Sequence, residues 1–550
     1  MTSDIEIAQS IKPNSITQIG KKIGLKTENL KTYGQYIAKV SPPPEKKAFG
    51  KLVLVSGMSP TAAGEGKTTV AIGLDDALNQ LEKKSLVALR EPSMGPVFGL
   101  KGGATGGGRS QLIPMEDINL SFTGDIPAIG YANNLLAALV DSSIKHKNPL
   151  DFDLKRIALK RVLDINDRQL RQVIDGLGGH ANGSLRPDGF SITAACEIMA
   201  IICLAKNPGD LKRRLGQIVV GYSKKNQPIT AGDLQAQGAL AVVLKDAIRP
   251  NLVQTLAGNG ALVHGGPFAN IAHGASSLIA SRLALGLADY TITEAGFGAD
   301  LGAEKFLSIV SPRLKKLPEC VVLVASLRAL KENGGAKDYT KENRQALASG
   351  FKNLNRHLKN LKDVYGLNVV VALNRFRGDS TYELNLVSGW CKKQNTDVQI
   401  CDPWGKGGDG CLKLARQVIS VCQKPFNFTP VYHRGQTLVK KITAVAQKIY
   451  HAKKVAFTPR ATRQAKRIEK LGFSKLPVCI AKTQYSFSAD KNLRGAPKDF
   501  TLPVKSLSIK AGAGFVVAYT GSILTMPGLP KDPAAAHMDI DDSGKVSGLF

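Results

Sequence analysis

The fold is decided by one stretch of sequence, Leu52-Val-Leu-Val-Ser-Gly-Met-Ser-Pro-Thr-Ala-Ala-Gly-Glu-Gly-Lys-Thr-Thr-Val70. An apolar run passes into a glycine-rich loop, and a helix is expected to begin near Lys67 and Thr68. Gly64 and Gly66 allow the loop to turn its N–H groups inward, while the positive end of the helix and the charge of Lys67 face the same point. We therefore predict a phosphate-binding loop at the end of a buried strand.

This loop departs from the usual pattern G-x-x-x-x-G-K-[ST] at its first position, which is Thr61. A Gly-Lys-Thr tripeptide by itself is more often an ordinary helix start. The apolar run before it and the helical pattern after it favour nucleotide binding, with Thr68 placed to hold Mg²⁺ beside the phosphates.

The composition is that of a globular protein with an excess of positive charge. The 550 residues are too many for one simple core, and 74 basic against 44 acidic residues give a net charge of +30. Such an excess favours polyanionic partners: nucleic acid, an acidic membrane or acidic small molecules. Aromatic residues make up only 6%, and no basic block is interleaved with them, so a nucleic-acid surface is not expected.

The eight cysteines never form a C-x-x-C pair and lie far apart, which is typical of free thiols in a reducing compartment. The N-terminus carries acidic residues and no long apolar segment, unlike a secretory signal. The longest apolar stretch, 192–205, contains Glu197 and is too short to cross a bilayer. We therefore expect a cytoplasmic protein with no membrane span.

Continuous apolar runs rich in β-branched residues alternate with helical patterns along the chain. Strands are expected at 52–56, 86–89, 290–293, 321–325 and 369–373. Such runs suit strands buried on both faces, so we predict an α/β fold built on a P-loop-type, mostly parallel sheet flanked by helices. Ligands of these sheets bind at the carboxyl ends of the strands.

Three domains are expected. Residues 1–310 are predicted to form the nucleotide-binding domain, with a mainly helical insertion at about 141–250. Residues 311–430 are predicted to form a second α/β domain, and residues 431–550 a C-terminal α+β domain.

Two charged residues are candidates for chemistry. Arg90 opens the turn Arg90-Glu-Pro-Ser directly after a predicted strand, where a guanidinium is suited to grip a small carboxylate or a phosphoryl group. The alternative is a salt bridge with Glu91 or another neighbour. Asp125, in Thr-Gly-Asp125, is placed to take a proton or orient a ligand, although Gly-Asp is also common in turns.

Histidines and aromatics in glycine-rich loops form a second group. His264 and His273 match no zinc spacing, which leaves phosphate contact or a buried structural role. Phe376 and Trp404 lie in separate polar loops, where they can sandwich a flat heterocycle or serve as ordinary packing.

Several motifs together carry a family resemblance. They are Ser59-Pro-Thr-Ala-Ala-Gly-Glu-Gly-Lys-Thr68, Arg90-Glu-Pro-Ser-Met-Gly-Pro-Val-Phe-Gly99, Pro114-Met-Glu-Asp-Ile-Asn119, His264-Gly-Gly-Pro-Phe-Ala-Asn-Ile-Ala-His-Gly274, Thr293-Glu-Ala-Gly-Phe-Gly-Ala-Asp-Leu-Gly-Ala-Glu-Lys305 and Lys482-Thr-Gln-Tyr-Ser486. On these motifs nearly the whole chain resembles formate–tetrahydrofolate ligase, a carbon–nitrogen bond-forming ligase (EC 6.3.4.3).

The resemblance implies a two-step ligation. Formate attacks the terminal phosphate of MgATP to give formyl phosphate, and tetrahydrofolate then takes the formyl group, leaving 10-formyltetrahydrofolate, ADP and phosphate. It also implies a homotetramer activated by monovalent cations, and the composition makes a membrane or nucleic-acid partner an unexpected one.

Site roles follow from the same resemblance. Arg90 grips formate and formyl phosphate, Lys67 serves catalysis as well as binding, and Asp125 helps in amine deprotonation or folate orientation. Phe376 and Trp404 flank the pterin. The residues expected to hold ATP are Thr61, Ala62, Ala63, Gly64, Glu65, Gly66, Lys67 and Thr68, the last also as the metal ligand.

The chain departs from the family pattern at five positions. Ser121 and Pro127 stand where relatives carry histidines, Ala62 replaces a proline, Arg109 a tyrosine and Arg377 a proline. These departures and the net charge leave an alternative open, a catalytically weak homologue that acts as a basic nucleic-acid- or folate-binding protein. A third hypothesis, another type of P-loop ATPase, does not account for the aromatic loops.

Overall fold

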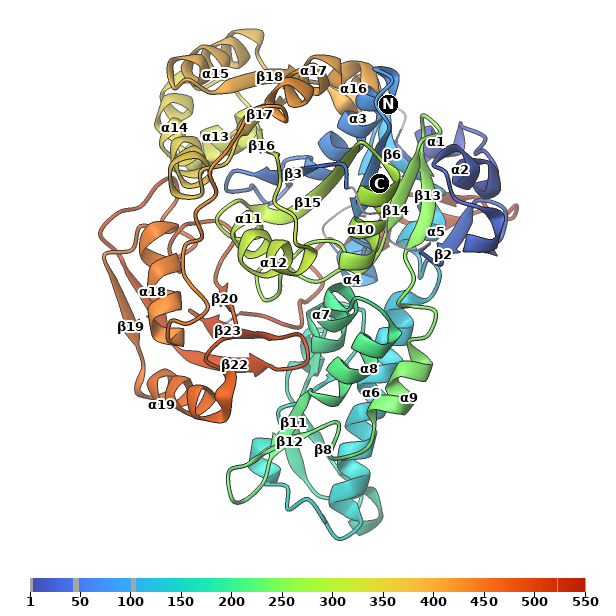
Figure 1. The fold of residues 1–550 in the computed structure, drawn as a ribbon, viewed down its shortest axis with the longest axis vertical. Helices are drawn as coiled ribbons and strands as arrows, with labels where there is room; N and C mark the ends of the chain where they lie inside the picture. The colour runs from blue at the N-terminus through green and yellow to red at the C-terminus, as the bar shows by residue number, and fades with distance from the viewer. Residues whose placement is uncertain (1–2, 43–48, 100–104, 522, 550) are drawn as a thin grey trace.

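The computed structural model describes residues 3–42, 49–99, 105–521 and 523–549. Its centre is a sheet of twelve strands (Figure 1). In spatial order, ten of them are β1 (Leu30–Tyr33), β2 (Ile37–Val40), β13 (Asn251–Thr255), β14 (Gly260–Val263), β4 (Ser85–Leu89), β15 (Tyr290–Gly298), β3 (Lys51–Gly57), β16 (Cys320–Ala325), β17 (Val369–Asn374) and β18 (Asp397–Cys401). The other two are β6 (Ser110–Ile113), which pairs with β13, and β5 (Gly106–Gly107), which pairs with β6.

The five strands expected from the sequence form the middle of this sheet. β4, β15, β3, β16 and β17 are neighbours in that order, and each pair is parallel. The prediction of a mostly parallel α/β sheet is confirmed. β15 is longer than the expected strand 290–293 and includes Glu294.

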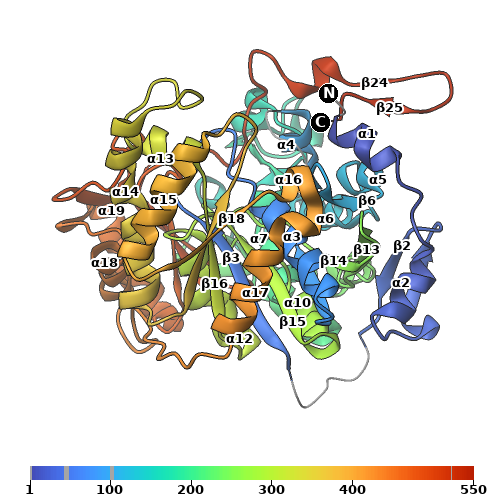
Figure 2. The ribbon, with the colours of Figure 1, turned by 90° about the horizontal axis from the view of Figure 1, so that it is seen from above.

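Alternate side chains of β3 face two layers of helices, as the pleat requires. Val53 and Val55 pack with α3 (Lys67–Gln80) and α17 (Leu412–Val421), which Figure 2 shows on one face of the sheet. Leu52 and Leu54 belong to the core on the other face, which includes residues of α10 (Leu278–Leu287) and α13 (Leu327–Asn333). Both faces of the strand are therefore covered.

Residues 141–250 begin in the last turns of α6 (Asp125–Lys145) and extend away from the sheet (Figure 1). The helices there are α7 (Glu197–Leu204), α8 (Pro208–Gly216) and α9 (Gln237–Val243). They are accompanied by short strand pairs, β7 (Arg161–Val162) with β10 (Phe190–Ser191), β8 (Val173–Asp175) with β9 (Arg186–Asp188), and β11 (Val219–Tyr222) with β12 (Pro228–Thr230). The insertion is thus more mixed than a mainly helical segment.

Residues 311–430 continue the central sheet. β16, β17 and β18 extend it beyond β3, so no break in the sheet falls at 310/311. The division into domains stays a prediction. The helices of this part are α12 (Ser311–Leu314), α13, α14 (Arg344–Lys359), α15 (Thr381–Lys393), α16 (Pro403–Lys406) and α17.

The C-terminal part mixes helices with small sheets. Its elements are α18 (Leu438–Lys448), β19 (Lys454–Phe457), α19 (Pro459–Ile468), β20 (Val478–Ala481), β21 (Thr501–Val504), β22 (Ser506–Lys510), β23 (Phe515–Tyr519), β24 (Asp539–Ile540) and β25 (Val546–Ser547). Gln9 at the end of α1 (Asp4–Gln9) donates a hydrogen bond to the carbonyl of Val546, 3.0 Å away. Both ends of the chain lie beside α1 in Figures 1 and 2.

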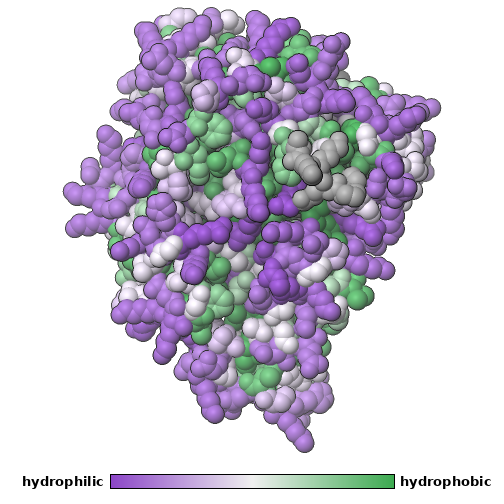
Figure 3. Space-filling model, in the orientation of Figure 1, coloured by the Kyte–Doolittle hydropathy of each residue, from purple (hydrophilic) through white to green (hydrophobic). Residues whose placement is uncertain are grey.

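Hydrophilic residues cover most of the face in Figure 3, with apolar patches between them. In the part of the chain that the structure describes, no helix combines the length and apolar character needed to span a bilayer. All eight cysteines are buried and free of disulfides.

Candidate active site

The glycine-rich loop joins β3 to α3, as the sequence predicts. Gly66 precedes the helix with φ of 69° and Gly64 has φ of 84°, backbone conformations that favour glycine. A Cβ on Gly66 would lie 2.5 Å from Asn374 Nδ2. Glycine is therefore required there by conformation and by space, and the strand–loop–helix arrangement is confirmed.

Neighbouring strands hold this loop in place. The buried carboxylate of Glu65 accepts a hydrogen bond from the Thr61 N–H at 2.7 Å and another from the Ser326 hydroxyl. Asn374 Nδ2 donates to the Glu65 carbonyl at 3.0 Å. Ser326 follows β16 and Asn374 ends β17, so the carboxyl ends of two strands fix the loop. Ala62 and Ala63 lie exposed at its tip.

The start of α3 is positively polarised. Gly66 has no side chain to cap the helix, so the first-turn N–H groups lack an intrahelical acceptor and the dipole adds to their charge. The stem of Lys67 passes over the end of β3, since a Cβ on Gly57 would lie 3.3 Å from Lys67 Cδ. The N-terminus of α3 is therefore suited to an anion.

Glu294 connects this helix to the arginine turn. Its buried carboxylate accepts a hydrogen bond from Thr68 Oγ1 at 2.8 Å through one oxygen. The other oxygen lies 3.1 Å from Arg90 Nη2 and 3.3 Å from Arg90 Nε. Because β15 lies between β3 and β4, the Glu294 side chain reaches the segments that follow these two strands. Glu294 therefore links the first turn of α3 to the arginine turn.

The Arg90 guanidinium lies against the backbone of Gly296 as well as against the carboxylate of Glu294. A Cβ on Gly296 would lie 3.0 Å from Arg90 Nη1, so a side chain at Gly296 would displace the guanidinium. The Arg90 side chain remains 22% exposed. It is fixed on one side and open to a ligand on the other. The salt bridge foreseen as an alternative exists, but with Glu294 rather than with Glu91.

Burial raises the pKa of Glu91 well above its usual value, with the charge of Asp125 acting in the same direction. Its backbone N–H donates to the carbonyl of Gly265 at 2.8 Å, which ties the turn to the histidine segment. Glu91 thus supports the turn from inside the protein.

Asp125 stands at the start of α6 in a buried polar cluster. Its oxygens lie 2.6 Å and 2.8 Å from Lys39 Nζ, and Asn251 Nδ2 donates to one of them at 2.9 Å. Lys39 and Asn251 lie on β2 and β13, two strands that the structure places beyond β14. Because both carboxylate oxygens of Asp125 already have partners, this geometry favours a role in orienting a ligand over a role in proton transfer.

The two histidines are buried. The two ring nitrogens of His264 lie 2.7 Å from the Ser277 hydroxyl and 2.7 Å from the Ala247 carbonyl. These contacts favour the buried structural role that the sequence left open for this histidine. Burial lowers the pKa of His264 to about 4 and that of His273 to about 3, where the charges of Arg313 and Arg90 act in the same direction. Both rings are neutral near pH 7, so neither adds positive charge for phosphate.

The predicted aromatic pair lies on loops that leave neighbouring strands, because Asn374 of β17 pairs with Cys401 of β18. Phe376 lies under the Arg328 guanidinium, 4.5 Å from the ring centroid, and a Cβ on Gly66 would lie 3.9 Å from its Cζ. This ring therefore lies beside the glycine-rich loop.

Trp404 lies on α16, and its ring is 43% exposed with its indole N–H donating to Asp4 Oδ1 at 3.1 Å. Gly108, with φ of 58°, passes so close that a Cβ there would lie 2.6 Å from Trp404 Cγ. Among the described residues, Phe376 and Trp404 form no stacked pair with each other. Each ring is held by its own neighbours, and a shared ligand stays a prediction.

A metal site made of protein ligands alone is not found: the described residues contain no group of three histidine, cysteine or acidic side chains suited to one. Oxygen donors nevertheless meet at Thr68 and Glu294, and these suit Mg²⁺ when phosphate oxygens complete the set.

Glu65 was expected to hold ATP, and the structure shows its carboxylate accepting hydrogen bonds from Thr61 and Ser326. The residues that the sequence did not assign to the site are Glu294, the main one, together with Ser326 and Asn374, which support the loop. Their common signal is a polar residue at or near the carboxyl end of a buried strand. That signal identifies an edge of the sheet but not which segments a side chain joins.

The fold and site define an α/β protein with a glycine-rich loop, a helix N-terminus and an arginine turn at the carboxyl edge of a parallel sheet, an arrangement typical of enzymes that act on phosphorylated substrates. The family model of formate–tetrahydrofolate ligase matches residues 2–550. The chain belongs to this family, which is one of ligases of folate metabolism with ATP, formate and tetrahydrofolate as substrates.

Proposed function

We propose that the chain joins formate to tetrahydrofolate through formyl phosphate, giving 10-formyltetrahydrofolate, ADP and phosphate, the reaction EC 6.3.4.3. The observation that supports this most is the Glu294 carboxylate, which holds Thr68 at 2.8 Å and Arg90 at 3.1 Å. Through it, the residues that we propose for nucleotide and for formate are held next to one another.

In the first step a formate oxygen attacks the terminal phosphorus of ATP. A P–O bond to formate forms, the P–O bond to ADP breaks, and ADP leaves. The loop from Thr61 to Thr68 holds ATP, the N–H groups of the first turn of α3 and the Lys67 ammonium stabilise the phosphate charge, and Arg90 holds the formate oxygens. Mg²⁺ at Thr68, with Glu294 nearby, would neutralise charge on the phosphates.

In the second step the amine of tetrahydrofolate attacks the formyl carbon. A C–N bond forms, the C–O bond to phosphate breaks, the nitrogen loses its proton to solvent, and phosphate leaves. Phe376 and Trp404 position the pterin. We assign Asp125 an orienting role, since Lys39 and Asn251 occupy both carboxylate oxygens.

The test uses purified protein with formate labelled with ¹⁸O. ADP release is expected only when formate and ATP are both present, and the label is expected in the phosphate released when tetrahydrofolate is added. Unlabelled phosphate would contradict the formyl phosphate route. No formate-dependent ADP release would contradict the ligase activity itself.

The net charge of +30 favours one second candidate, a basic binding protein with little activity. RNA binding that weakens steeply with salt, together with absent turnover, would support it. We further propose a cytoplasmic homotetramer activated by monovalent cations, as the family resemblance implies. Light scattering and turnover in potassium against tetramethylammonium salts test these last two points.

A further inference from the structure

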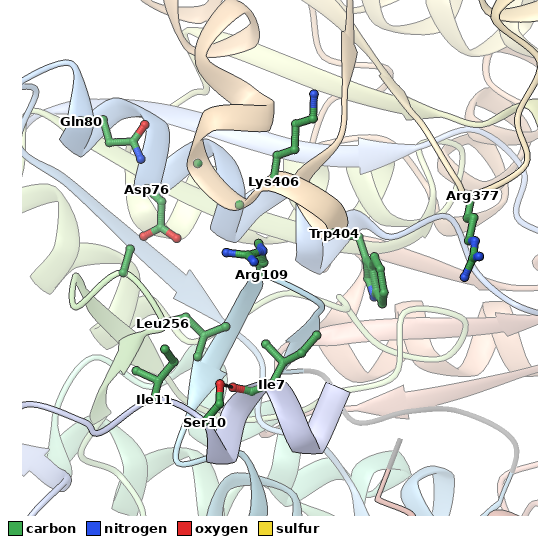
Figure 4. A pocket seen from close by; sticks show the side chains of 13 residues that line it. Ile7, Ser10, Ile11, Asp76, Gln80, Arg109, Leu256, Arg377, Trp404 and Lys406 are labelled. Carbon is green, nitrogen blue, oxygen red and sulfur yellow. Dashed lines mark hydrogen bonds between the residues drawn. The ribbon is translucent and has the colours of Figure 1, made fainter. Parts of the chain in front are cut away.

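The proposed ligase site uses only a small part of the positive charge of the chain. Figure 4 shows Arg109, Arg377 and Lys406 around a cavity of about 740 Å³ beside Trp404, next to the proposed pterin site. These cations are few against a net charge of +30. Most of the excess therefore lies outside the site and has no role in the proposed reaction.

Five cationic side chains follow one side of α19 and the turn after it. They recur every three or four residues, the spacing that places side chains on the same side of a helix. Arg460, Arg463, Lys466 and Lys470 are exposed, and in the part of the chain that the structure describes these four form no ion pair. The fifth is Arg467. We call these five residues the basic stripe.

The opposite side of α19 is buried in the C-terminal part of the chain. Ala461, Ala465 and Ile468 belong to the apolar core, and Gln464 Oε1 accepts a hydrogen bond from the Leu507 N–H of β22 at 2.9 Å. Cations at three- and four-residue spacing repel one another and lower the stability of a helix. The basic stripe therefore does not stabilise the fold, and its charge needs another explanation.

Arg467 joins the basic stripe to the insertion, where Figure 1 shows α19 near β11 and β12. Its Cζ lies 4.1 Å from the centroid of the Tyr222 ring, and the Cζ of Arg156 lies 4.6 Å from the same centroid. Both arginines also donate hydrogen bonds to Asn226. Burial lowers the pKa of Arg467, and the charge of Arg156 acts in the same direction. The two guanidiniums repel one another, and a bridging anion would relieve this repulsion.

The chemistry of this surface favours a nucleic-acid duplex among the possible polyanions. Single strands stack their bases on aromatic rings, whereas α19 has no aromatic residue and the Tyr222 ring already has two guanidiniums against it. Helices at membrane surfaces insert their apolar side into lipid, but the apolar side of α19 is buried in the protein. Contacts to the phosphates of a duplex need neither feature.

The length of the basic stripe also suits a duplex. From Arg460 to Lys470 the helical rise gives about 15 Å, and a duplex carries about nine phosphates over that length of its axis. Each exposed cation of the stripe can therefore meet a phosphate without bending the duplex.

We propose that the basic stripe binds the phosphates of a nucleic-acid duplex without reading its base sequence. The composition argued against a nucleic-acid partner because aromatic residues are few, but that argument concerns base stacking rather than phosphate contacts. The proposal goes beyond the ligase reaction and does not depend on it, since α19 holds none of the residues proposed for substrates.

The test measures the fluorescence anisotropy of a labelled 20-base-pair RNA duplex titrated with the full chain, in the absence of substrates. If the four exposed cations each neutralise one phosphate, the logarithm of the association constant falls with the logarithm of the salt concentration with a slope of about −3.6. This slope corresponds to a loss of about 150-fold between 50 and 200 mM KCl. A second duplex of unrelated sequence should bind equally well.

The triple variant Arg460→Gln, Arg463→Gln, Lys466→Gln should reduce the slope to about −0.9 and weaken binding at 50 mM KCl at least 100-fold. Glutamine is a good helix former, so the variant should keep the wild-type urea unfolding curve. Lys470→Gln lies outside α19 and should weaken binding about tenfold by itself. The double variant Arg460→Lys, Arg463→Lys keeps the charge and should keep the slope.

The matched control is Lys352→Gln, Lys392→Gln, Lys393→Gln, which removes the same charge from exposed positions on α14 and α15, away from α19 (Figure 1). This control should keep the affinity and the slope of the wild type. Equal losses in the control and in the triple variant, or wild-type binding by the triple variant, would overturn the inference. Tighter binding to phosphatidylserine vesicles than to the duplex would overturn it in favour of a membrane surface.

Discussion

Glu294→Gln tests whether one carboxylate unites the site. The substitution keeps the shape but removes the charge that receives two hydrogen bonds from Arg90 and one from Thr68. Loss of one partner of a fully buried ion pair costs about 3–5 kcal/mol. Since the Arg90 side chain is 22% exposed, we expect a loss of about 2 kcal/mol in the free energy of unfolding.

The effect on turnover should be separate from this loss. A guanidinium displaced by about 1 Å costs about 100-fold in rate, equivalent to about 2.7 kcal/mol in the activation barrier. MgATP affinity should fall, because the carboxylate of Glu294 is one of the two oxygen donors proposed to hold Mg²⁺ beside the phosphates. Formate-dependent ADP release, ATP binding and urea unfolding measure the three quantities.

The control is Glu197→Gln, which alters a buried carboxylate that accepts hydrogen bonds from the N–H groups of Gly512 and Ala513 and none from Thr68 or Arg90. It should lower stability and leave turnover per folded molecule unchanged. If Glu294→Gln keeps its rate within threefold of wild type, the carboxylate is structural and the reasoning fails.

Three further outcomes follow from the same geometry. Lys67→Ala should abolish nucleotide-dependent turnover and leave folate binding intact in calorimetry; equal loss of both would make Lys67 structural. Trp404→Ala should raise the dissociation constant of tetrahydrofolate about tenfold while ATP affinity is kept, since base–aromatic stacking is worth about 1–3 kcal/mol, and an unchanged constant would remove Trp404 from the site. Burial raises the pKa of Glu304 from 4.5 to about 7. Between these two values the folded protein keeps a proton on Glu304 that the unfolded chain loses, so the free energy of unfolding should fall as the pH rises from about 4.5 to 7. Glu304→Gln should flatten that part of a melting-temperature profile, and an unaltered slope would contradict the assignment.

The middle of the sheet was predictable because each of its strands is encoded by a short contiguous stretch of sequence. Each of the five central strands is a continuous apolar run, and α3 begins at Lys67 where the glycine-rich loop ends. The outer strands were not predicted. β2 contains Lys39, a fully buried lysine whose partners Asp125, Asn251 and the Arg249 carbonyl all lie far along the chain.

The same distinction holds for the site. The loop from Thr61 to Thr68 is contiguous, so its residues could be named from the sequence. The role of Glu294 depends on β15 lying between β3 and β4, which is a property of strand order. Asp125 could also be named from the sequence, as a carboxylate that takes a proton or orients a ligand. Its ion pair with Lys39 could not, because Lys39 lies on a strand that was not predicted.

The position of β15 also bears on how the chain folds. β3 and β4 are close in sequence but never pair, because β15, about 200 residues later, occupies the space between them. Until that strand arrives, two apolar strands expose unpaired backbone, which invites association with other chains. We expect the chain to refold slowly and to aggregate early in refolding at high protein concentration. Nucleotide affinity should be among the last properties that the refolding protein recovers.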